Sequence, residues 1–262
     1  MPAGYTHYQF GQDLLCQMQN QELKEMILKH KDLFNIGLHG PDIFFYHRPY
    51  YFKDKLNRYG NNMHHTMAAP FFNQARQHIE NEDQLVYILG FICHYLLDSR
   101  LHGYIQEIIN TKHISHFEIE SQYDARFMIK NHLKPTHTLL YRHIVVNEYT
   151  VSHIQHFFPQ FSYLEIEETL RSMHTYDQLL LAPNILKRGI LYLGFLLTGH
   201  FKDLQGLVMN YKTNHYLDHE LDHLDILYQQ TLNETEKILL DYFHHQPLSS
   251  RFHHDYESTN PL

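Results

Sequence analysis

The chain lacks features that would assign it to several large classes of protein. It has two cysteines in 262 residues, Cys16 and Cys93, too few for a disulfide framework and typical of a reduced, cytosolic protein. Its longest apolar run, 189–197, is too short to span a bilayer and predicts a buried helix. The first twenty residues lack the basic and apolar segments of a secretory signal. We therefore expect a cytoplasmic protein with at most peripheral membrane contact.

Positive charge is also scarce. The chain has 21 Lys and Arg against 29 Asp and Glu, a formal charge of −8 with histidine neutral. Long nucleic acids are held by broad basic surfaces, so we expect no such partner. Histidine, by contrast, is abundant, with 25 residues. This number makes the charge sensitive to pH between about 5 and 7 and favours a metal site, although most of the histidines must be ordinary surface or core residues.

No segment alternates polar and apolar residues as a strand does, whereas helical spacing recurs along the chain. The clearest helix is 82–110, whose apolar residues cover more than one face, so it should be central and buried. We expect the other helices at 9–34, 113–131, 161–181, 184–204 and 215–243. We expect a loop or short turn at 35–51, a loop leading into a helix across 58–79, and a flexible polar tail at 247–262. With no repeat and no linker, residues 1–262 predict a single all-α domain, an irregular multi-helix bundle with a metal cluster between its helices.

Residues 94–104, "HYLLDSRLHGY", place His94, Asp98 and His102 at intervals of four on the central helix. These side chains lie within about 80° of one another on one face. A lone buried histidine is usually a satisfied core residue, but a buried carboxylate beside two histidines is costly unless something such as metal compensates it. Eight residues of helix rise about 12 Å, whereas metal–ligand bonds are about 2 Å long. The stripe therefore predicts more than one ion, with Asp98 between His94 and His102.

Further donors are available elsewhere. His116 and Glu120 are four residues apart on the next expected helix, a competent pair for one ion. His7, Asp42 and the adjacent His64 and His65 occur in loop-like or terminal sequence. Each motif is weak alone in a chain so rich in histidine.

A second histidine stripe, His215, His219 and His223, is interleaved with acidic residues. It is either an additional metal site or a polar helix face, and we favour the polar face.

Taken in order, five segments resemble the zinc-dependent phospholipase C family, all-helical three-zinc hydrolases whose architecture is shared by S1/P1-type nucleases. The segments are "THYQFG", "GLHGPDIFFYHRP", "GNNMHH", "CHYLLDSRLHGY" and "HFEIESQYDA". The resemblance covers roughly residues 3–124 and rests on the order and spacing of all five.

The resemblance implies a ligand set and two or three Zn²⁺ ions. One ion would be bound by Asp42, His64 and His94. An alignment shifted by one residue would place His65 at the position of His64. Asp98 would complete this site and bridge toward a third ion. The second ion would take His102, His116 and Glu120. His7 would serve the third, whose occupancy stays open because secreted members also use their processed N-terminal residue.

Such a cluster suits a phosphoester hydrolase in which a metal-activated water attacks phosphorus and Asp42 orients or deprotonates that water. We expect a small phosphoester or phospholipid-like substrate. The aromatic run beside Asp42, residues 44–52, could form an apolar lip or a cation–π wall, or could pack in the core. Arg48 could pair with phosphate or be solvated.

Two alternatives stay open. A nuclease or nucleotidase of the same fold would share the metal cluster, and a non-catalytic metal-binding helical protein would keep the fold without turnover. The oligomeric state is not indicated by the sequence.

Overall fold

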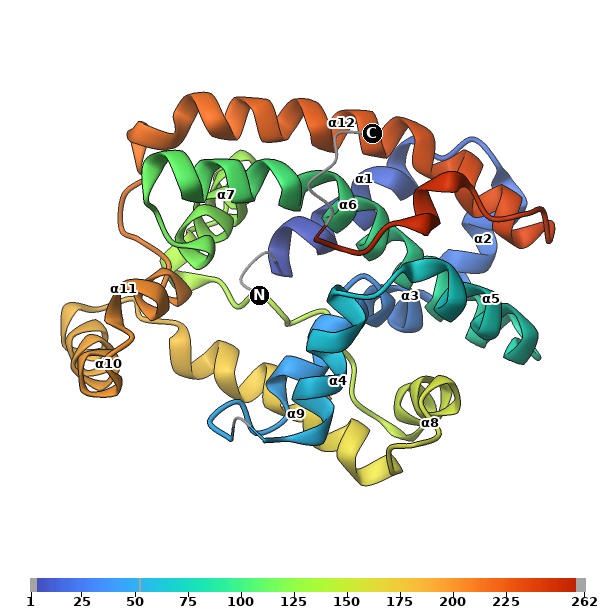
Figure 1. Ribbon diagram of the computed structural model, residues 1–262, viewed down its shortest axis with the longest axis horizontal. Coiled ribbons are helices and arrows are strands. Elements are labelled where there is room, and N and C mark those ends of the chain that lie inside the picture. The colour runs from blue at the N-terminus through green and yellow to red at the C-terminus, as the bar shows by residue number, and fades with distance from the viewer. Residues whose placement is uncertain (1–3, 52, 258–262) are drawn as a thin grey trace.

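A computed structural model describes residues 4–51 and 53–257 of the chain. Over these residues the protein is helical and has no strand, which confirms the predicted all-α class (Figure 1). The α-helices are α1 Gly4–Gln17, α2 Gln21–Lys29, α3 Lys31–Gly37, α4 Lys55–His64, α5 Ala68–His78, α6 Glu82–Lys112, α7 His116–Lys130, α8 Glu148–Phe157, α9 Tyr163–Leu180, α10 Ile185–Thr198, α11 Phe201–Leu204 and α12 Asp218–Phe243. The 3-10 helices are η1 Gly40–Tyr46, η2 Pro135–His137, η3 Gln205–Leu207, η4 His215–Leu217 and η5 Ser250–His253.

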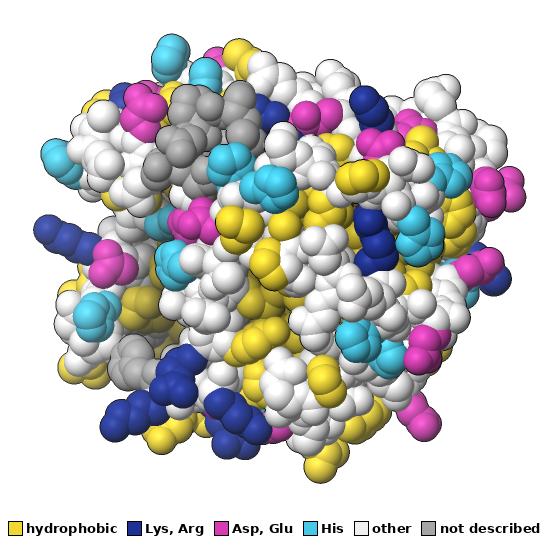
Figure 2. Space-filling view, turned by 45° about the vertical axis from the view of Figure 1, so that its right-hand side comes forward, with side chains coloured by type: hydrophobic (Ala, Val, Ile, Leu, Met, Phe, Trp, Pro, Cys, Tyr) yellow, Lys and Arg dark blue, Asp and Glu magenta, His cyan; other side chains and the backbone are white. Residues whose placement is uncertain are grey.

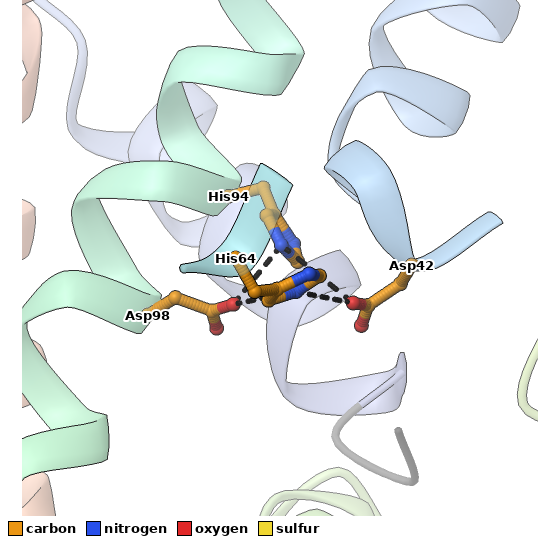
Figure 3. A group of neighbouring side chains, drawn as sticks. All are labelled: Asp42, His64, His94 and Asp98. Carbon is orange, nitrogen blue, oxygen red and sulfur yellow. Dashed lines mark ion pairs between the residues drawn. The ribbon is translucent and has the colours of Figure 1, made fainter. Parts of the chain in front are cut away.

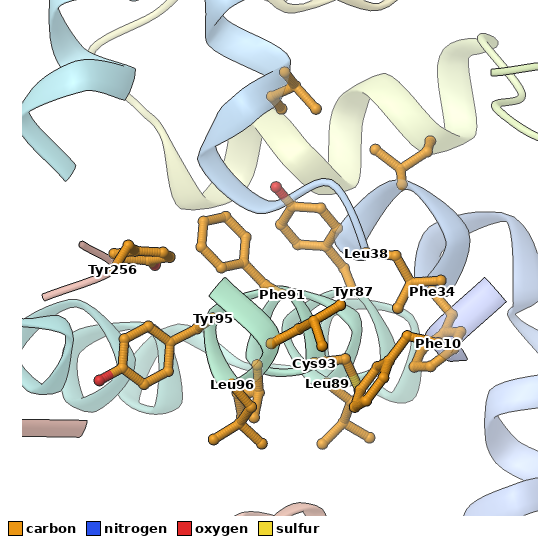
Figure 4. Packing of buried hydrophobic residues seen from close by; sticks show 14 of the residues in the cluster. Phe10, Phe34, Leu38, Tyr87, Leu89, Phe91, Cys93, Tyr95, Leu96 and Tyr256 are labelled. Atoms are coloured by element: carbon orange, nitrogen blue, oxygen red, sulfur yellow. The ribbon is translucent and has the colours of Figure 1, made fainter. Parts of the chain in front are cut away.

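Helix α6 is the central element, as its apolar sequence predicted. It packs against α1, α3, α12 and η1, and its aromatic and aliphatic side chains enter a common core with residues of α1 and α3 (Figure 4). The Asn81 side chain accepts a hydrogen bond from the Gln84 N–H at 3.0 Å and caps its first turn. At Gly90 an added Cβ would lie 2.3 Å from the Phe34 carbonyl oxygen, so glycine permits the close crossing of α3. Any side chain carried by the middle of α6 is therefore rigidly placed.

The helix predicted at 9–34 is wrong as a single element, because the chain forms α1, α2 and α3 instead. The break after α1 is held by side-chain hydrogen bonds. The Asn20 side chain accepts from the Leu23 N–H at 2.8 Å, and the N–H groups of Gln19 and Asn20 donate to the Glu236 carboxylate of α12. These polar contacts compete successfully with helix continuation.

The loop predicted at the start of 58–79 is also wrong. Residues 55–64 form α4, which Asp54 caps by accepting hydrogen bonds from the N–H groups of Leu56 and Asn57, each at 3.0 Å. The expected loop at 35–51 contains the end of α3 and then η1.

The C-terminal segment was predicted to be a flexible tail, and for residues 247–257 this is wrong. Phe252 and Tyr256 are both 1% exposed, and Arg251 is buried as well. The Arg251 guanidinium donates to the Leu96 carbonyl of α6 at 2.9 Å, and the Tyr256 N–H donates to the His64 carbonyl at 3.1 Å. The segment folds back from α12 onto α6 (Figure 1). Residues 258–262 of the predicted tail lie outside the described residues.

The apolar run 189–197 forms a helix, as predicted, but it is not buried. In α10 the only buried residue is Arg188, and Leu193 and Leu197 are 58% and 81% exposed. The helix lies with α11 at one end of the molecule, away from α6 (Figure 1).

Within the described residues no single helix has the length and apolar character to cross a membrane. Helices α9 and α10 pass such a test only as a pair, and that pair is bent by 114°.

Candidate metal centre

Two groups of donor side chains lie side by side at the centre of the molecule. The first is Asp42, His64, His94 and Asp98, whose facing atoms are all within 4.8 Å of one another. The second is His102, His116 and Glu120, within the same limit. Among the described residues these are the groups of three or more donors that could hold an ion. His94 and His102 fall in different groups, as the rise of the helix requires.

The first group converges from three elements: η1 supplies Asp42, α4 supplies His64, and α6 supplies His94 and Asp98 (Figure 3). The His64 Nε2 lies 3.0 Å from an Asp42 oxygen, and the His94 Nε2 lies 3.0 Å from the Asp98 Oδ2. Ligands at about 2.0–2.1 Å around a tetrahedral zinc are separated by roughly 3.3 Å. The spacing of the donors therefore suits an ion placed among them.

The second group joins the end of α6 to the start of α7. The His116 Nε2 lies 2.9 Å from the Glu120 Oε1, and the His102 Nε2 lies 3.6 Å from the same oxygen. Glu120 and His102 are buried, whereas the His116 side chain is 33% exposed. This group is therefore nearer to solvent than the first.

Asp98 links the two groups and also contacts His7. Its Oδ2 faces His94, while its Oδ1 lies 3.0 Å from the His7 Nε2 and 3.8 Å from the His102 Nε2. His7 is buried in α1, and its ring stacks on His94 with centroids 4.3 Å apart. The structure thus brings together all eight residues expected to bind metal, and their role as ligands stays a prediction.

Two histidines of the first group are oriented by backbone carbonyls. The His64 Nδ1 donates to the Gly60 carbonyl at 2.8 Å, and the His94 Nδ1 donates to the Leu38 carbonyl at 3.3 Å. Because each Nδ1 makes this contact, the Nε2 of each ring faces the group and is the nitrogen that can bind a metal ion once it has lost its proton. The buried Nε2 of His94 makes no hydrogen bond among the described residues and lies 3.0 Å from the Asp98 Oδ2. The chemistry and the spacing of the donors both fit zinc.

Gly40 explains the turn that presents Asp42. Its φ of +44° lies in the left-handed region, which other residues rarely adopt. An added Cβ would lie 2.2 Å from the His94 ring. Glycine is therefore needed both for the turn and for its close approach to His94.

Asp124 is a supporting residue that the sequence analysis did not identify. Its carboxylate accepts hydrogen bonds from the Thr6 N–H and hydroxyl at 2.7 and 2.6 Å, and from the Tyr5 N–H at 3.3 Å. It thereby caps the first turn of α1 and ties His7 to α7. Asp124 continues the four-residue spacing of His116 and Glu120, a signal that could have indicated it.

The charges within the centre stabilise one another. Burial alone would raise the pKa of the Asp98 carboxyl, but the imidazoles of His94, His102 and His7 bring it well below its usual value. Burial alone would lower the pKa of His102, but carboxylates led by Asp98 raise it to about 10. Asp98 is therefore ionised, as a metal ligand must be, whereas His102 holds a proton that zinc has to displace.

The C-terminal segment forms part of the wall of the centre. The Tyr256 ring lies 5.2 Å from the His64 ring, centroid to centroid, and 6.0 Å from the His94 ring. The Glu257 Oε1 lies 3.7 Å from the His102 Nδ1. No motif indicated these residues, because the surrounding sequence is polar.

Both groups open onto one cavity of about 320 Å³. Its lining includes Asp42, His64, Asp98, His102, His116 and Glu120, together with Phe45 and Glu257. A molecule in this cavity can contact both donor groups at once.

The remaining candidates do not join the groups. His65 is exposed at the end of α4 and lines the cavity outside the first group, so His64 is the better placed of the two. His219 of the second stripe is exposed. Histidines are scattered over the surface of one face (Figure 2). Cys93 is buried and packs in the core, as expected.

The aromatic run beside Asp42 divides between two environments. Phe44 and Tyr46 are buried, whereas Tyr50 and Tyr51 are 76% and 54% exposed. Phe52 lies outside the described residues. Arg48 is neither aimed at the centre nor free, because its guanidinium binds Glu168 at 3.1 and 3.2 Å.

Comparison with known proteins gives one finding. A sequence profile of the zinc-dependent phospholipase C family matches residues 6–168. No curated protein and no solved structure gives a significant match. The matched segment is more than half of the chain and contains every residue of the two donor groups. It extends beyond residue 124, where the resemblance in the sequence ended. The chain therefore belongs to the zinc-dependent phospholipase C family, an all-helical family of metal-dependent hydrolases.

Proposed function

We propose that the protein is a zinc-dependent phosphodiester hydrolase that acts on a phospholipid-like substrate. The observation that carries the proposal is the pair of donor groups that line one cavity, with Asp98 of the first group 3.8 Å from His102 of the second. Asp42, His64, His94 and Asp98 would hold one ion and His102, His116 and Glu120 a second. When bound, zinc neutralises charge on phosphate oxygens and makes water more acidic. A third ion would lie between His7 and Asp98. The number of zinc ions per chain, measured by metal analysis, tests this part of the proposal.

Asp42 is the proposed general base. Its side chain is 19% exposed, whereas those of His64, His94 and Asp98 are 6% exposed or less. Burial opposes ionisation, but the hydrogen bond from His64 and the charge of His94 lower the pKa of the Asp42 carboxyl, which is therefore ionised and has no proton of its own to lose first. It also lines the cavity. A carboxylate that is ionised and accessible can orient a water molecule against a phosphate held there and take its proton.

The proposal is tested by metal analysis combined with a substrate panel. Purified protein is expected to contain zinc and to hydrolyse a phosphocholine diester, and Asp42→Asn is expected to retain zinc while losing roughly a hundredfold or more in kcat. A protein without zinc, or a zinc-loaded protein that hydrolyses no phosphoester, contradicts the proposal. Hydrolysis of single-stranded nucleic acid in place of the lipid-like diester would identify a nuclease of the same fold.

A further inference from the structure

Helix α10 presents an unusual outward face. Its six most exposed aliphatic residues are 58–81% exposed, and they are Ile185, Leu186, Ile190, Leu193, Leu196 and Leu197. At 100° per residue these positions fall within an arc of about 140°. The arc contains no charged or hydrogen-bonding side chain, only the glycine at 189 besides these six. A contiguous apolar face of this kind indicates an interaction site.

The opposite face holds the helix in place. The buried Arg188 guanidinium donates to the Met209 carbonyl and lies 4.2 Å from the Tyr211 ring centroid. Leu191, Tyr192 and Phe195 on the same side are partly buried. The outward face is therefore a fixed feature of the surface.

A second cavity, of about 340 Å³, lies behind α10. Residues that line it include Phe45, Tyr46, Leu180, Phe195, Leu207 and Met209. Asp177 is the charged residue among those described around it, and its carboxylate accepts a hydrogen bond from the Tyr141 N–H at 2.9 Å. The Tyr46 hydroxyl is hydrogen-bonded to Tyr141. The cavity therefore offers mainly hydrocarbon surface to an occupant.

This apolar cavity borders the metal centre. Phe45 lines both cavities, and its ring lies 5.1 Å from the His64 ring, centroid to centroid. An amphiphile could thus place its phosphate beside the donor groups and a hydrocarbon chain on the other side of Phe45.

We propose that α10 docks into the hydrocarbon boundary of a phospholipid bilayer, and that the cavity behind it receives an acyl chain of the lipid whose phosphate reaches the metal centre. The acyl-chain part rests on the proposed function, because it assumes a lipid phosphodiester as substrate. Helix α10 lies outside the segment that matches the family.

A lipid surface suits the face better than a second copy of the chain. The apolar cavity behind the helix leads past Phe45 to the metal centre, an arrangement that serves a lipid substrate and has no use in the pairing of two copies. Fourteen residues give a helix about 21 Å long and about 10 Å wide. The helix is also too short to cross the roughly 30 Å hydrocarbon core, so it would lie in the plane of the interface. The exposed rings of Tyr50 and Tyr211 beside the cavity and the helix suit the headgroup level.

The docking surface is tested by co-sedimentation with phosphatidylcholine vesicles. The double variant Leu193→Gln, Leu197→Gln is expected to bind vesicles at least about tenfold more weakly than the wild-type chain. Because the face is uncharged, added salt should leave wild-type binding nearly unchanged. The matched control is Leu164→Gln, which alters a leucine that is 70% exposed at the far end of α9 and should leave binding intact.

Three results would overturn the docking surface: wild-type protein that does not bind the vesicles, a double variant that binds as well as the wild type, or a wild-type dimer that the double variant dissociates. Binding measured with Asp42→Asn separates the two proposals, because it needs no turnover. If Asp42→Asn binds and no zinc-loaded protein hydrolyses a phosphoester, the proposed function fails and the docking surface stands.

The acyl-chain cavity is tested with monomeric phosphocholine diesters of increasing chain length. KM is expected to fall about fourfold per added methylene until the cavity is filled, in both the wild type and the double variant. A KM independent of chain length, in a protein that does hydrolyse these diesters, would overturn the assignment of the cavity.

Discussion

The metal centre and the outward face of α10 place polar and apolar side chains in opposite ways. At the centre, charged residues such as Asp98 and Glu120 are 4% exposed, whereas on α10 Leu197 is 81% exposed. Both arrangements are costly in an isolated folded chain, because buried charge loses hydration and exposed hydrocarbon orders water. Each cost is offset when the proposed partner binds, zinc in one case and lipid in the other. The two regions differ, however, in how strongly their residues depend on one another. The donors of the centre contact one another, so loss of one should affect the others, whereas the side chains of α10 face solvent independently.

The largest expected effect tests that coupling directly. Asp98→Ala removes the carboxylate that faces both donor groups and is expected to reduce zinc content at both, not at one. Catalytic activity should fall about a thousandfold, which corresponds to several kcal/mol of lost stabilisation. Metal analysis and kinetics measure the two effects. His65→Ala is the control, because this exposed histidine lines the same cavity without joining a group. Loss of only one ion from Asp98→Ala would contradict the coupling.

The next effect concerns stability. Tyr256→Ala removes a ring that is 1% exposed and packs 4.8 Å from Tyr95, centroid to centroid. Truncation of such a buried aromatic residue typically costs about 3–5 kcal/mol. Tyr256→Phe is the matched control and should be nearly neutral, because the hydroxyl has no hydrogen-bond partner among the described residues. Chemical denaturation measures both. By contrast, Leu197→Gln on α10 should change the free energy of unfolding by less than about 0.5 kcal/mol. Equal losses in the free energy of unfolding from Tyr256→Ala and Leu197→Gln would contradict the distinction between a packed centre and an unpacked outward face of α10.

The smallest effect is a dependence on pH that should be confined to the centre. The raised pKa of His102, about 10 against 6.5 in the unfolded chain, stabilises the metal-free protein fully below pH 6.5, and this contribution is lost as pH rises through about 10. The affinity for zinc increases over the same pH range, because fewer protons compete with the metal for the histidines. The Tm difference between zinc-loaded and chelator-treated protein should therefore widen by a few degrees from pH 6.5 to 9.

Thermal denaturation at several pH values measures that difference, and His102→Gln should reduce its slope. Vesicle binding through α10 should stay constant over the same range. A Tm difference that does not change with pH would show that His102 does not exchange its proton for metal.

The sequence allowed much of the centre to be predicted, because the information is local. Four-residue spacing on a long helix determines that His94, Asp98 and His102 share a face, and the same spacing holds for His116 and Glu120. His7, Asp42 and His64 could be added only through the family resemblance, since long-range packing brings their elements to α6. The broad class was predictable because helical periodicity recurs along the whole chain.

The errors have one physical origin. The apolar character of the run 189–197 indicated burial. However, the hydrophobic periodicity of a helix does not show whether its apolar face packs in the core or is exposed on the surface. Conversely, the polar residues of 247–257 indicated a tail, although Arg251, Phe252 and Tyr256 among them make the buried contacts. In both cases the decisive contacts are with residues far away in the chain or with a separate molecule.

The placement of His94, Asp98 and His102 on an unbroken helix has a consequence for sequence alignment. Inserting one residue between 94 and 102 would rotate part of the stripe by about 100° and separate the donor groups. An alignment of this chain with a distant relative should therefore contain no gap in that interval. An ungapped nine-residue block with the three donors at its first, fifth and ninth positions is thus a usable search pattern for relatives that share little other similarity.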